Sequence, residues 1–161
     1  MKGYLERFLQ MSDLVGNKNI VLTKEEFERL LKGGLQKFDF VSLKCLGDFN
    51  KEIPVEKSGI KGALVEANYG IAETGTVVVE SSSENFRRAT SLCDELSVAV
   101  GVSNIVPRLE DIADFLKNTT TRGAHFISFI TGASRTADIE MSLTMGVHGP
   151  VTMVIYLIKD L

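Results

Sequence analysis

The chain has 161 residues, a length sufficient for one domain whose hydrophobic core needs no disulfide or metal to stabilise it. Its formal net charge is −3, with acidic and basic residues mixed along the sequence, so it lacks the basic field that attracts nucleic acids. It also lacks a signal-peptide pattern and any apolar stretch near the roughly 18 residues of a membrane-spanning helix. We therefore expect a soluble cytoplasmic protein with no nucleic-acid partner and no membrane span.

The two cysteines, Cys45 and Cys93, lie far apart in the sequence and form no Cys-x-x-Cys motif. With only two histidines to assist them, they do not fit an iron–sulfur cluster or a structural zinc site. We predict that both are buried free thiols. The chain is accordingly expected to hold no metal and no intrinsic cofactor.

The first part of the chain shows the signals of two helices and a short strand. An apolar face at helical spacing predicts a helix from Lys2 to Met11, and a strand is expected from Ile20 to Leu22. Thr23 and Glu26 have the spacing of a capping box, which begins a second helix. Gly33-Gly34 is expected to end this helix in a left-handed conformation.

The middle of the chain is richer in strand formers. A strand is predicted between Phe38 and Leu46, followed by an irregular segment from Asp48 to Gly62 that contains proline, glycine and many charges. The residues from Thr76 to Glu80 form a β-branched run with almost no polar interruption. Such a run is typical of a parallel strand that is covered on both faces.

The second half alternates between helices and strands. Ser81 and Glu84 have capping-box spacing and predict a helix that continues to about Cys93. This alternation favours a layered α/β fold with a mostly parallel sheet and right-handed crossovers. The remaining predicted elements are a strand from Leu96 to Val102, a helix from Pro107 to Leu116, a strand from His125 to Ile130, a helix from Ser134 to Met145 and a strand from Val151 to Ile158.

The first candidate site is the turn that precedes the run of valines. Gly75 lies between Thr74 and Thr76, an arrangement that suits a tight turn with exposed backbone N–H groups. Glu73 beside this turn can serve as a base, a nucleophile or a carboxylate that binds hydroxyl groups. The alternative is a turn whose threonine hydroxyls satisfy local backbone groups and whose glutamate is solvated.

The second candidate site follows the predicted strand that ends at Ile130. A turn of small residues there leads into the predicted helix, so backbone N–H groups, the Ser134 hydroxyl and Arg135 are expected to form an anion site. Helical spacing places Asp138 and Glu140 on different faces, which excludes a carboxylate pair. The alternative is an ion pair between Arg135 and Asp138, with Ser134 as the helix cap.

A shared pocket is expected where these two turns meet. Open α/β sheets bind ligands outside the carboxyl ends of their strands, and the turn after Ile130 follows such an end. His148 lies in the loop before the last strand and can approach the same edge. Glu73 is the candidate catalytic residue, no residue is assigned to a metal, and the candidate ligand-binding residues are Thr74, Gly75, Thr76, Gly132, Ser134, Arg135, Thr136, Asp138 and His148.

Four segments together resemble the LUD-domain proteins of the lactate-utilization protein C type. The resemblance extends from about Leu64 to the end of the sequence, whereas the part from Met1 to Ala63 is more divergent. We therefore expect a single LUD-like domain over residues 1–161. The four segments are Ile71 to Thr76, Asn104 to Asp111, Thr131 to Glu140 and Gly146 to Pro150.

The resemblance implies a three-layer α/β/α fold similar to the group of ribose-5-phosphate isomerase, glucosamine-6-phosphate deaminase and CoA transferases. It also implies a role in the oxidation of L-lactate to pyruvate, together with an iron–sulfur subunit and a cysteine-rich subunit. Two isolated cysteines exclude this chain as either redox subunit, so we expect a non-redox component that binds a small anionic ligand. The chain departs from the family pattern at Ala133, where relatives usually have proline, and at Leu96, where they commonly have histidine.

Two other functions remain open at this stage. One is a stand-alone enzyme of the transferase or isomerase kind that uses Glu73 on a CoA or sugar-phosphate substrate, an analogy that rests on fold kinship. The other is a regulatory module that binds a ligand without catalysis. A homo-oligomer is compatible with each of these functions.

Overall fold

The computed structural model describes residues 2–123, 125–133, 135–136, 144–145 and 149–161. Its central feature is a five-stranded sheet in which all neighbouring strands are parallel. This arrangement confirms the α/β class with a mostly parallel sheet that the sequence predicts. In spatial order the strands are β1 (Lys18–Leu22), β11 (Thr152–Ile158), β6 (Cys93–Gly101), β3 (Ile60–Glu66) and β2 (Phe40–Ser42).

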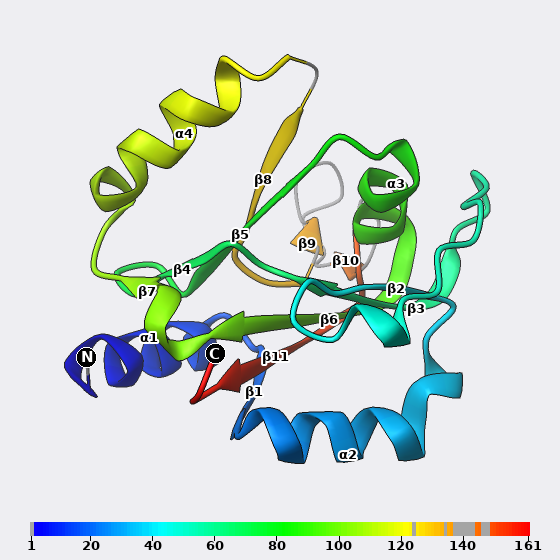
Figure 1. Cartoon of the computed structure of the whole chain (residues 1–161), viewed down its shortest axis with the longest axis horizontal. Coiled ribbons are helices and arrows are strands. Elements are labelled where there is room, and N and C mark those ends of the chain that lie inside the picture. Colours follow the sequence, from blue (N-terminus) through cyan, green and yellow to red (C-terminus); the bar gives the residue numbers. More distant parts are fainter. Residues whose placement is uncertain (1, 124, 134, 137–143, 146–148) are drawn as a thin grey trace.

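Helix α2 (Lys24–Gly34) covers one face of this sheet (Figure 1). The predicted capping box is present, because Thr23 Oγ1 accepts a hydrogen bond from the Glu26 amide at 3.1 Å and the Thr23 amide donates to Glu26 Oε2 at 2.7 Å. Phe27 and Leu31 are fully buried against the sheet, and burial of each contributes about 2–3 kcal/mol. The predicted left-handed end is wrong, since Gly34 has φ −136° and the chain continues into a 3₁₀ turn, η1 (Leu35–Lys37).

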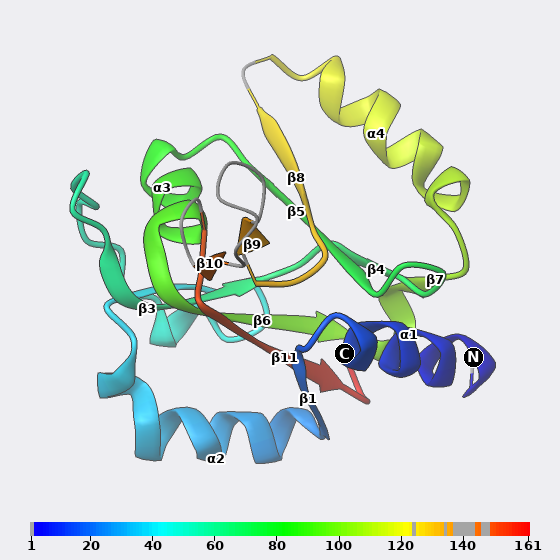
Figure 2. The same cartoon turned by 180° about the vertical axis from the view of Figure 1, so that it is seen from behind.

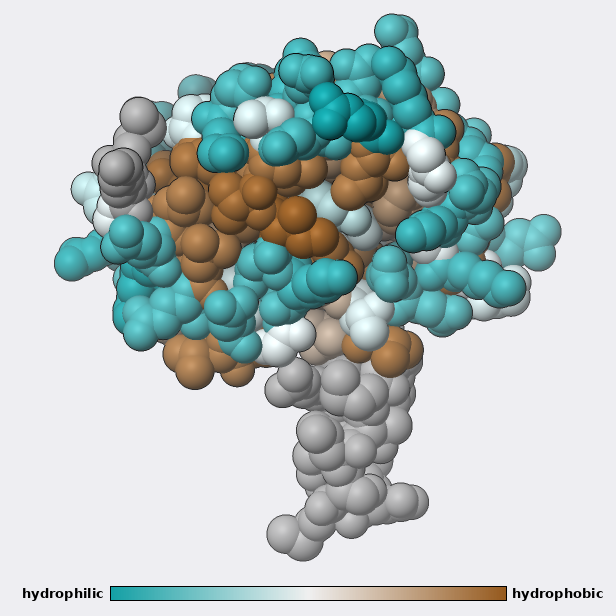
Figure 3. Space-filling model, turned by 90° about the horizontal axis from the view of Figure 1, so that it is seen from below, coloured by the Kyte–Doolittle hydropathy of each residue, from teal (hydrophilic) through white to brown (hydrophobic). Residues whose placement is uncertain are grey.

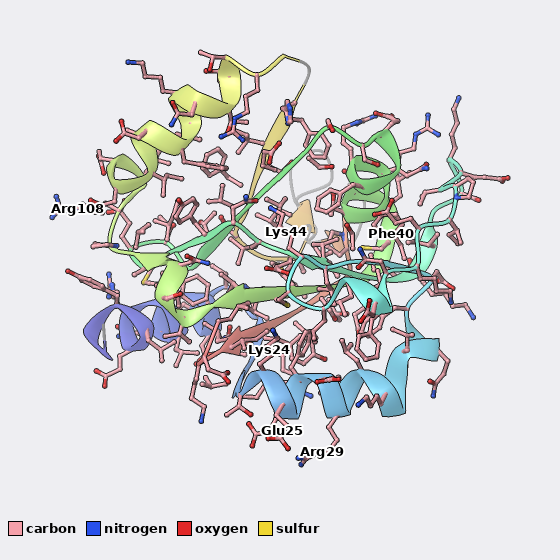
Figure 4. All side chains as sticks on the ribbon, in the orientation of Figure 1. Lys24, Glu25, Arg29, Phe40, Lys44 and Arg108 are labelled. Carbon is pink, nitrogen blue, oxygen red and sulfur yellow. The ribbon has the colours of Figure 1, made fainter. Side chains whose placement is uncertain are left out.

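The outer side of α2 is polar. Glu25 and Arg29 point away from the sheet there (Figure 4) and form an ion pair at 2.9 Å. Both side chains are well exposed, so the pair adds little to stability. The helix is therefore held mainly by its buried face.

The opposite face of the central sheet packs against α1 (Lys2–Leu14), α3 (Glu84–Leu92) and a second, four-stranded sheet. The prediction of the first helix is confirmed, and this helix extends to Leu14. The largest core cluster fills this layer, with Phe8 of α1 and Phe86 of α3 against the central strands. The second sheet has the order β7 (Ile105–Val106), β4 (Tyr69–Ile71), β5 (Thr76–Ser81) and β8 (Phe126–Ile130).

Strand β5 corrects one sequence prediction. It is buried on both faces, as predicted, but it pairs antiparallel with both β4 and β8. Val77 and Val79 face the central sheet, while Val78 packs against Ile112. The outer cover consists of η4 (Leu109–Ile112) and α4 (Ala113–Thr120), so a helical layer buries this strand's second face without a parallel neighbour.

The predicted helix over residues 134–145 is wrong at both ends. Instead, two short strands, β9 (Arg135–Thr136) and β10 (Thr144–Met145), form an antiparallel pair. Thr144 is opposite Thr136, and Met145 is opposite Arg135. In both views this pair lies between the end of β8 and α3 (Figure 1, Figure 2). Threonines at these ends favour extended backbone, and the apolar spacing used for the helix was too weak to decide against it. Residues 137–143, and with them Asp138 and Glu140, lie outside the described residues.

Smaller differences concern element ends. Helix α3 is capped by Ser83, whose Oγ accepts from the Phe86 amide at 3.3 Å, and Ser81 instead accepts from the Ser83 amide. Strand β6 begins at Cys93, before the predicted Leu96, and β2 is shorter than predicted. No helix in the described part of the chain is long and apolar enough to cross a membrane.

Candidate functional site

Three turns that are distant in the sequence meet beside the second sheet. The Thr76 hydroxyl at the start of β5 lies 2.9 Å from the Thr131 hydroxyl after β8. The Thr131 carbonyl accepts a hydrogen bond at 2.8 Å from Asn17 Nδ2, in the turn between α1 and β1. These two hydrogen bonds bring part of both predicted constellations to one place.

The hydrogen bonds continue on either side of this junction. Thr74 Oγ1 lies 2.8 Å from Thr76 Oγ1, and Asn17 Nδ2 donates to Ser12 Oγ at 3.1 Å. Ser12 Oγ in turn donates to Asn19 Oδ1 at 2.8 Å. Because Ser12, Asn17 and Thr76 are buried, each bond fixes the orientation of the next polar group. We call the network formed by Ser12, Asn17, Thr74, Thr76 and Thr131 the hydroxyl network.

Two glycines allow the turns to approach this closely. Gly75 has φ +67°, and a Cβ atom there would lie 2.6 Å from the Ser12 amide nitrogen. A Cβ atom at Gly132 would lie 3.3 Å from Asn17 Oδ1. This Oδ1 atom is buried and has no hydrogen-bond partner within the described part of the chain.

A cavity of about 330 Å³ adjoins the hydroxyl network at Thr131. Residues 128–132 form one wall, and Gly149 with Pro150 forms another, so the ends of two sequence motifs line the same space. Thr90 and Ser91, at the end of α3, complete the lining. We call this space the motif cavity; its surface is mainly polar, with hydroxyl and backbone groups suited to a small polar ligand.

The motif cavity includes the turn after Ile130, as expected, but it also lies near the amino ends of two central strands. Ser91 closely precedes β6, and Pro150 closely precedes β11, so the cavity lies near the amino ends of these central strands. The carboxyl-edge rule was applied to β8, but β8 belongs to the second sheet. The cavity thus follows the carboxyl end of β8 but not that of a central strand, and the turn at Gly75 does not line it.

Glu73 lies next to the network in sequence but makes contacts elsewhere. Its amide donates to the Pro107 carbonyl at 3.1 Å, and its Oε1 accepts from the Leu109 amide at 3.5 Å. The side chain is exposed, and Glu73 does not line the motif cavity. Arg108, in the same neighbouring segment, projects away from the body of the molecule (Figure 4).

The structure places only part of the predicted site. Thr74, Gly75, Thr76 and Gly132 lie in or beside the hydroxyl network. Ser134, Asp138 and His148 are outside the described residues. Arg135 and Thr136 are described only as the backbone of β9.

Sequence reasoning missed Ser12, Asn17 and Thr90. Asn17 and Thr131 are separated by 114 positions, so no local spacing could have connected them. The polar segment that joins the first helix to the first strand was the only available signal. His125 pairs with Glu80 near the opposite end of β8 and does not line the cavity.

The cysteines have the properties of protonated thiols. Burial raises the pKa of Cys93 to about 12, and burial with the adjacent Glu66 carboxylate raises the pKa of Cys45 to about 12. Cys93 is buried as predicted, whereas Cys45 is only half-buried, and both are free. Among the described residues, no group of three or more His, Cys, Asp or Glu residues is placed to hold a metal ion.

Comparison with known sequences gives consistent matches. The model of the LUD domain matches residues 15–158. The chain is 39% identical over 105 residues to lactate utilization protein C of Bacillus subtilis, a match that covers 59% of this chain and 44% of that protein. It is 32% identical over 118 residues to lactate utilization protein C 1 of Bacillus mycoides, with 71% and 50% covered. The chain thus spans half or less of the length of these relatives.

A solved structure shares the fold. A crystal structure of a DUF162 family protein from Deinococcus radiodurans matches with a TM-score of 0.68, covering 98% of this chain and 97% of that one. The sequence identity is 15%, so this likeness concerns the fold alone.

Proposed function

The chain belongs to the LUD-domain family, and we propose on this basis that it takes part in lactate utilization without a redox centre of its own. The names of its relatives support the pathway, since several are called lactate utilization protein C. Its two cysteines support the non-redox role, because they lie far apart in the sequence and form no Cys-x-x-Cys motif of the kind that binds a cluster. Electron transfer would then belong to iron–sulfur and cysteine-rich partner subunits with which this chain docks.

The ligand we propose is a small carboxylate or a phosphate-bearing molecule in the motif cavity. The observation that carries this proposal is the hydrogen bond between Thr76 and Thr131, which joins two family-like motifs at the cavity wall. Hydroxyl groups and backbone amides there can donate to anionic oxygens. Ser134 and Arg135 follow the turn directly in sequence, and we propose them as the anion contacts.

Binding to the purified chain tests this ligand assignment. L-lactate, pyruvate and inorganic phosphate would each be titrated calorimetrically into the chain and into a Thr131→Val variant, which keeps the side-chain shape and removes the hydroxyl. We expect at least one of these anions to bind, with at least tenfold weaker binding by the variant. Thr121→Val is the matched control, because Thr121 is exposed at the end of α4. Absence of binding by all three anions, or equal binding by both threonine variants, would contradict the assignment.

The division of labour has a separate test. The purified chain alone should not oxidise L-lactate. It should contribute to that reaction only when redox partner subunits are present. Metal analysis and an activity assay with an artificial electron acceptor measure both properties. Copurification of a stoichiometric iron–sulfur cluster with this chain alone would contradict a non-redox role.

A further inference from the structure

A second, larger cavity of about 670 Å³ lies on the α2 side of the central sheet. It shares no lining residue with the motif cavity. Its floor consists of β1 and β11 residues, including Ile20, Val154 and Tyr156, and its wall includes Leu30 of α2. Seen from the side of α2, the surface carries an apolar band between hydrophilic borders (Figure 3). We call this space the α2 cavity.

The end of α2 leaves the cavity open. Gly33 and Gly34 both line it, and a Cβ atom built at either position would meet no atom within 4 Å. Neither glycine has a positive φ, so backbone conformation does not require glycine at these positions. The missing side chains therefore create space where α2 would otherwise close against the strands.

Hydroxyl groups lie beneath this space. Leu96 and Val98 face the opposite core layer, so alternation along β6 places Ser97 on the α2 side, in register with Val154. Ser97 is fully buried and does not line the cavity, and its hydroxyl group interacts with that of Tyr156. The Tyr156 hydroxyl lies near it, and burial, followed by the charge of Glu95, raises the Tyr156 pKa. Tyr156 is thus a protonated donor at neutral pH.

The mouth of the cavity is more basic than acidic. Lys18 and Lys37 are exposed there, opposed by Glu95. Thr152 Oγ1 donates to Glu95 Oε2 at 3.5 Å. A basic side chain therefore lies on each side of the mouth, while the apolar residues below exclude water from the rest of a ligand.

We propose that the α2 cavity binds a small anionic amphiphile, a carboxylate or sulfonate with an apolar body. The anionic group is attracted by the positive charges of Lys18 and Lys37 at the mouth, and the apolar body lies over Ile20, Leu30 and Val154. A polar atom at the buried end accepts a hydrogen bond from the hydroxyl of Tyr156, which lines the cavity. The volume is in the range of about 300–1,000 Å³ that small-molecule sites occupy. This site is distinct from the motif cavity in its lining residues, although Ala133 and Val151 of the α2 cavity directly follow Gly132 and Pro150 of the motif cavity.

A fluorescent anionic amphiphile, 8-anilinonaphthalene-1-sulfonate, serves as the probe. We expect one saturable site on the folded chain and displacement of the probe by decanoate. Gly34→Leu fills the cavity and should weaken probe binding at least tenfold. Gly3→Leu is the matched control, since Gly3 lies in α1, away from the cavity, with equally open space around it.

A second pair of variants keeps the test decisive if Gly34→Leu does not fold. Lys18→Glu with Lys37→Glu reverses the charge at the mouth and should weaken probe binding about fivefold or more, whereas Lys57→Glu should not. Unchanged probe binding in folded Gly34→Leu, or in the double lysine variant, would overturn the proposal. If light scattering shows that the unmodified chain is a dimer and that Gly34→Leu is a monomer, a second copy of the chain would be the occupant, and the proposal would be overturned.

Discussion

The two edges of the central parallel sheet satisfy their polar groups in different ways. At the carboxyl edge, Glu66 Oε2 accepts from the amides of Lys44 and Cys45 at 2.6 and 2.7 Å. Asp160 Oδ1 likewise accepts from the Lys24 amide at 2.7 Å. Lys24 and Lys44 are labelled in Figure 4, after β1 and β2 respectively. Carboxylates of the chain itself thus occupy the amides that an anionic ligand would use.

The amino edge has open space instead. The motif cavity and the α2 cavity both lie there, with volumes of about 330 and 670 Å³. Asn17 Oδ1 is buried near this edge without a hydrogen-bond partner in the described part of the chain. At the carboxyl edge, where open α/β sheets usually bind ligands, carboxylates of the chain thus take up loop amides, whereas the amino edge has the two cavities.

The largest expected loss of stability comes from a substitution at Gly75, where the turn before β5 packs closely against α1. Gly75→Ala places a Cβ atom 2.6 Å from the Ser12 nitrogen at a φ of +67°, so we expect a loss of about 3 kcal/mol or more in unfolding free energy. Urea denaturation measures this loss. Gly123→Ala is the control, because its φ is +105° but no atom lies within 4 Å of the added Cβ. An equal loss in both variants would mean that backbone strain, and not the contact with α1, requires glycine at position 75.

At the carboxyl edge, Glu66→Ala removes the acceptor of two backbone amides. The amides of Lys44 and Cys45 then lose their partner, and we expect a loss of about 1–3 kcal/mol in unfolding free energy. Glu56→Ala, at an exposed position, should change this free energy by less than about 0.5 kcal/mol. An unchanged unfolding free energy in Glu66→Ala would show that the hydrogen bonds from the Lys44 and Cys45 amides to this carboxylate do not stabilise the edge.

The hydroxyl network predicts an energetic coupling between Thr76 and Thr131. Thr76→Val and Thr131→Val should each lose about 1 kcal/mol, and the double variant should lose less than the sum by about 0.5–1 kcal/mol. Denaturation of the four chains in a double-mutant cycle measures the coupling. Strict additivity would contradict a direct hydrogen bond between the two hydroxyls.

The smallest effect is expected for Glu73. Its exposed carboxylate contacts the Leu109 amide and does not line the motif cavity, so Glu73→Gln should change the unfolding free energy by less than about 0.5 kcal/mol. It should also leave anion affinity unchanged in the calorimetric titration. A tenfold loss of affinity would place Glu73 in the site and favour the alternative of a stand-alone enzyme.

The sequence predicted local features better than distant contacts. The capping box of Thr23 and Glu26 needs residues only three positions apart, and it was confirmed. The apolar positions of residues 134–145 also fit a helical period, but antiparallel pairing between the ends of this segment produced β9 and β10. Such pairing is not encoded in a local period.

The candidate site shows the same limit. The turn at Gly75 was recognisable from its threonines and glycine, whereas its partner Ser12 lies on α1 and had no signal in that motif. Similarly, the helical layer that includes α4 covers the outer face of β5. Its valines are therefore buried on both faces, as in a parallel strand, although β5 pairs antiparallel with β8. Long-range packing decided both cases.

The most direct test of the account is amide chemical-shift mapping of the isotope-labelled chain during titrations with L-lactate, pyruvate and inorganic phosphate. We predict that at least one of these anions shifts the amides of Thr131, Gly132 and Gly149 at the amino edge, while those of Lys24, Lys44 and Cys45 remain unchanged. Saturable shifts confined to Lys24, Lys44 and Cys45 would contradict the account, because the anion would then bind at the carboxyl edge.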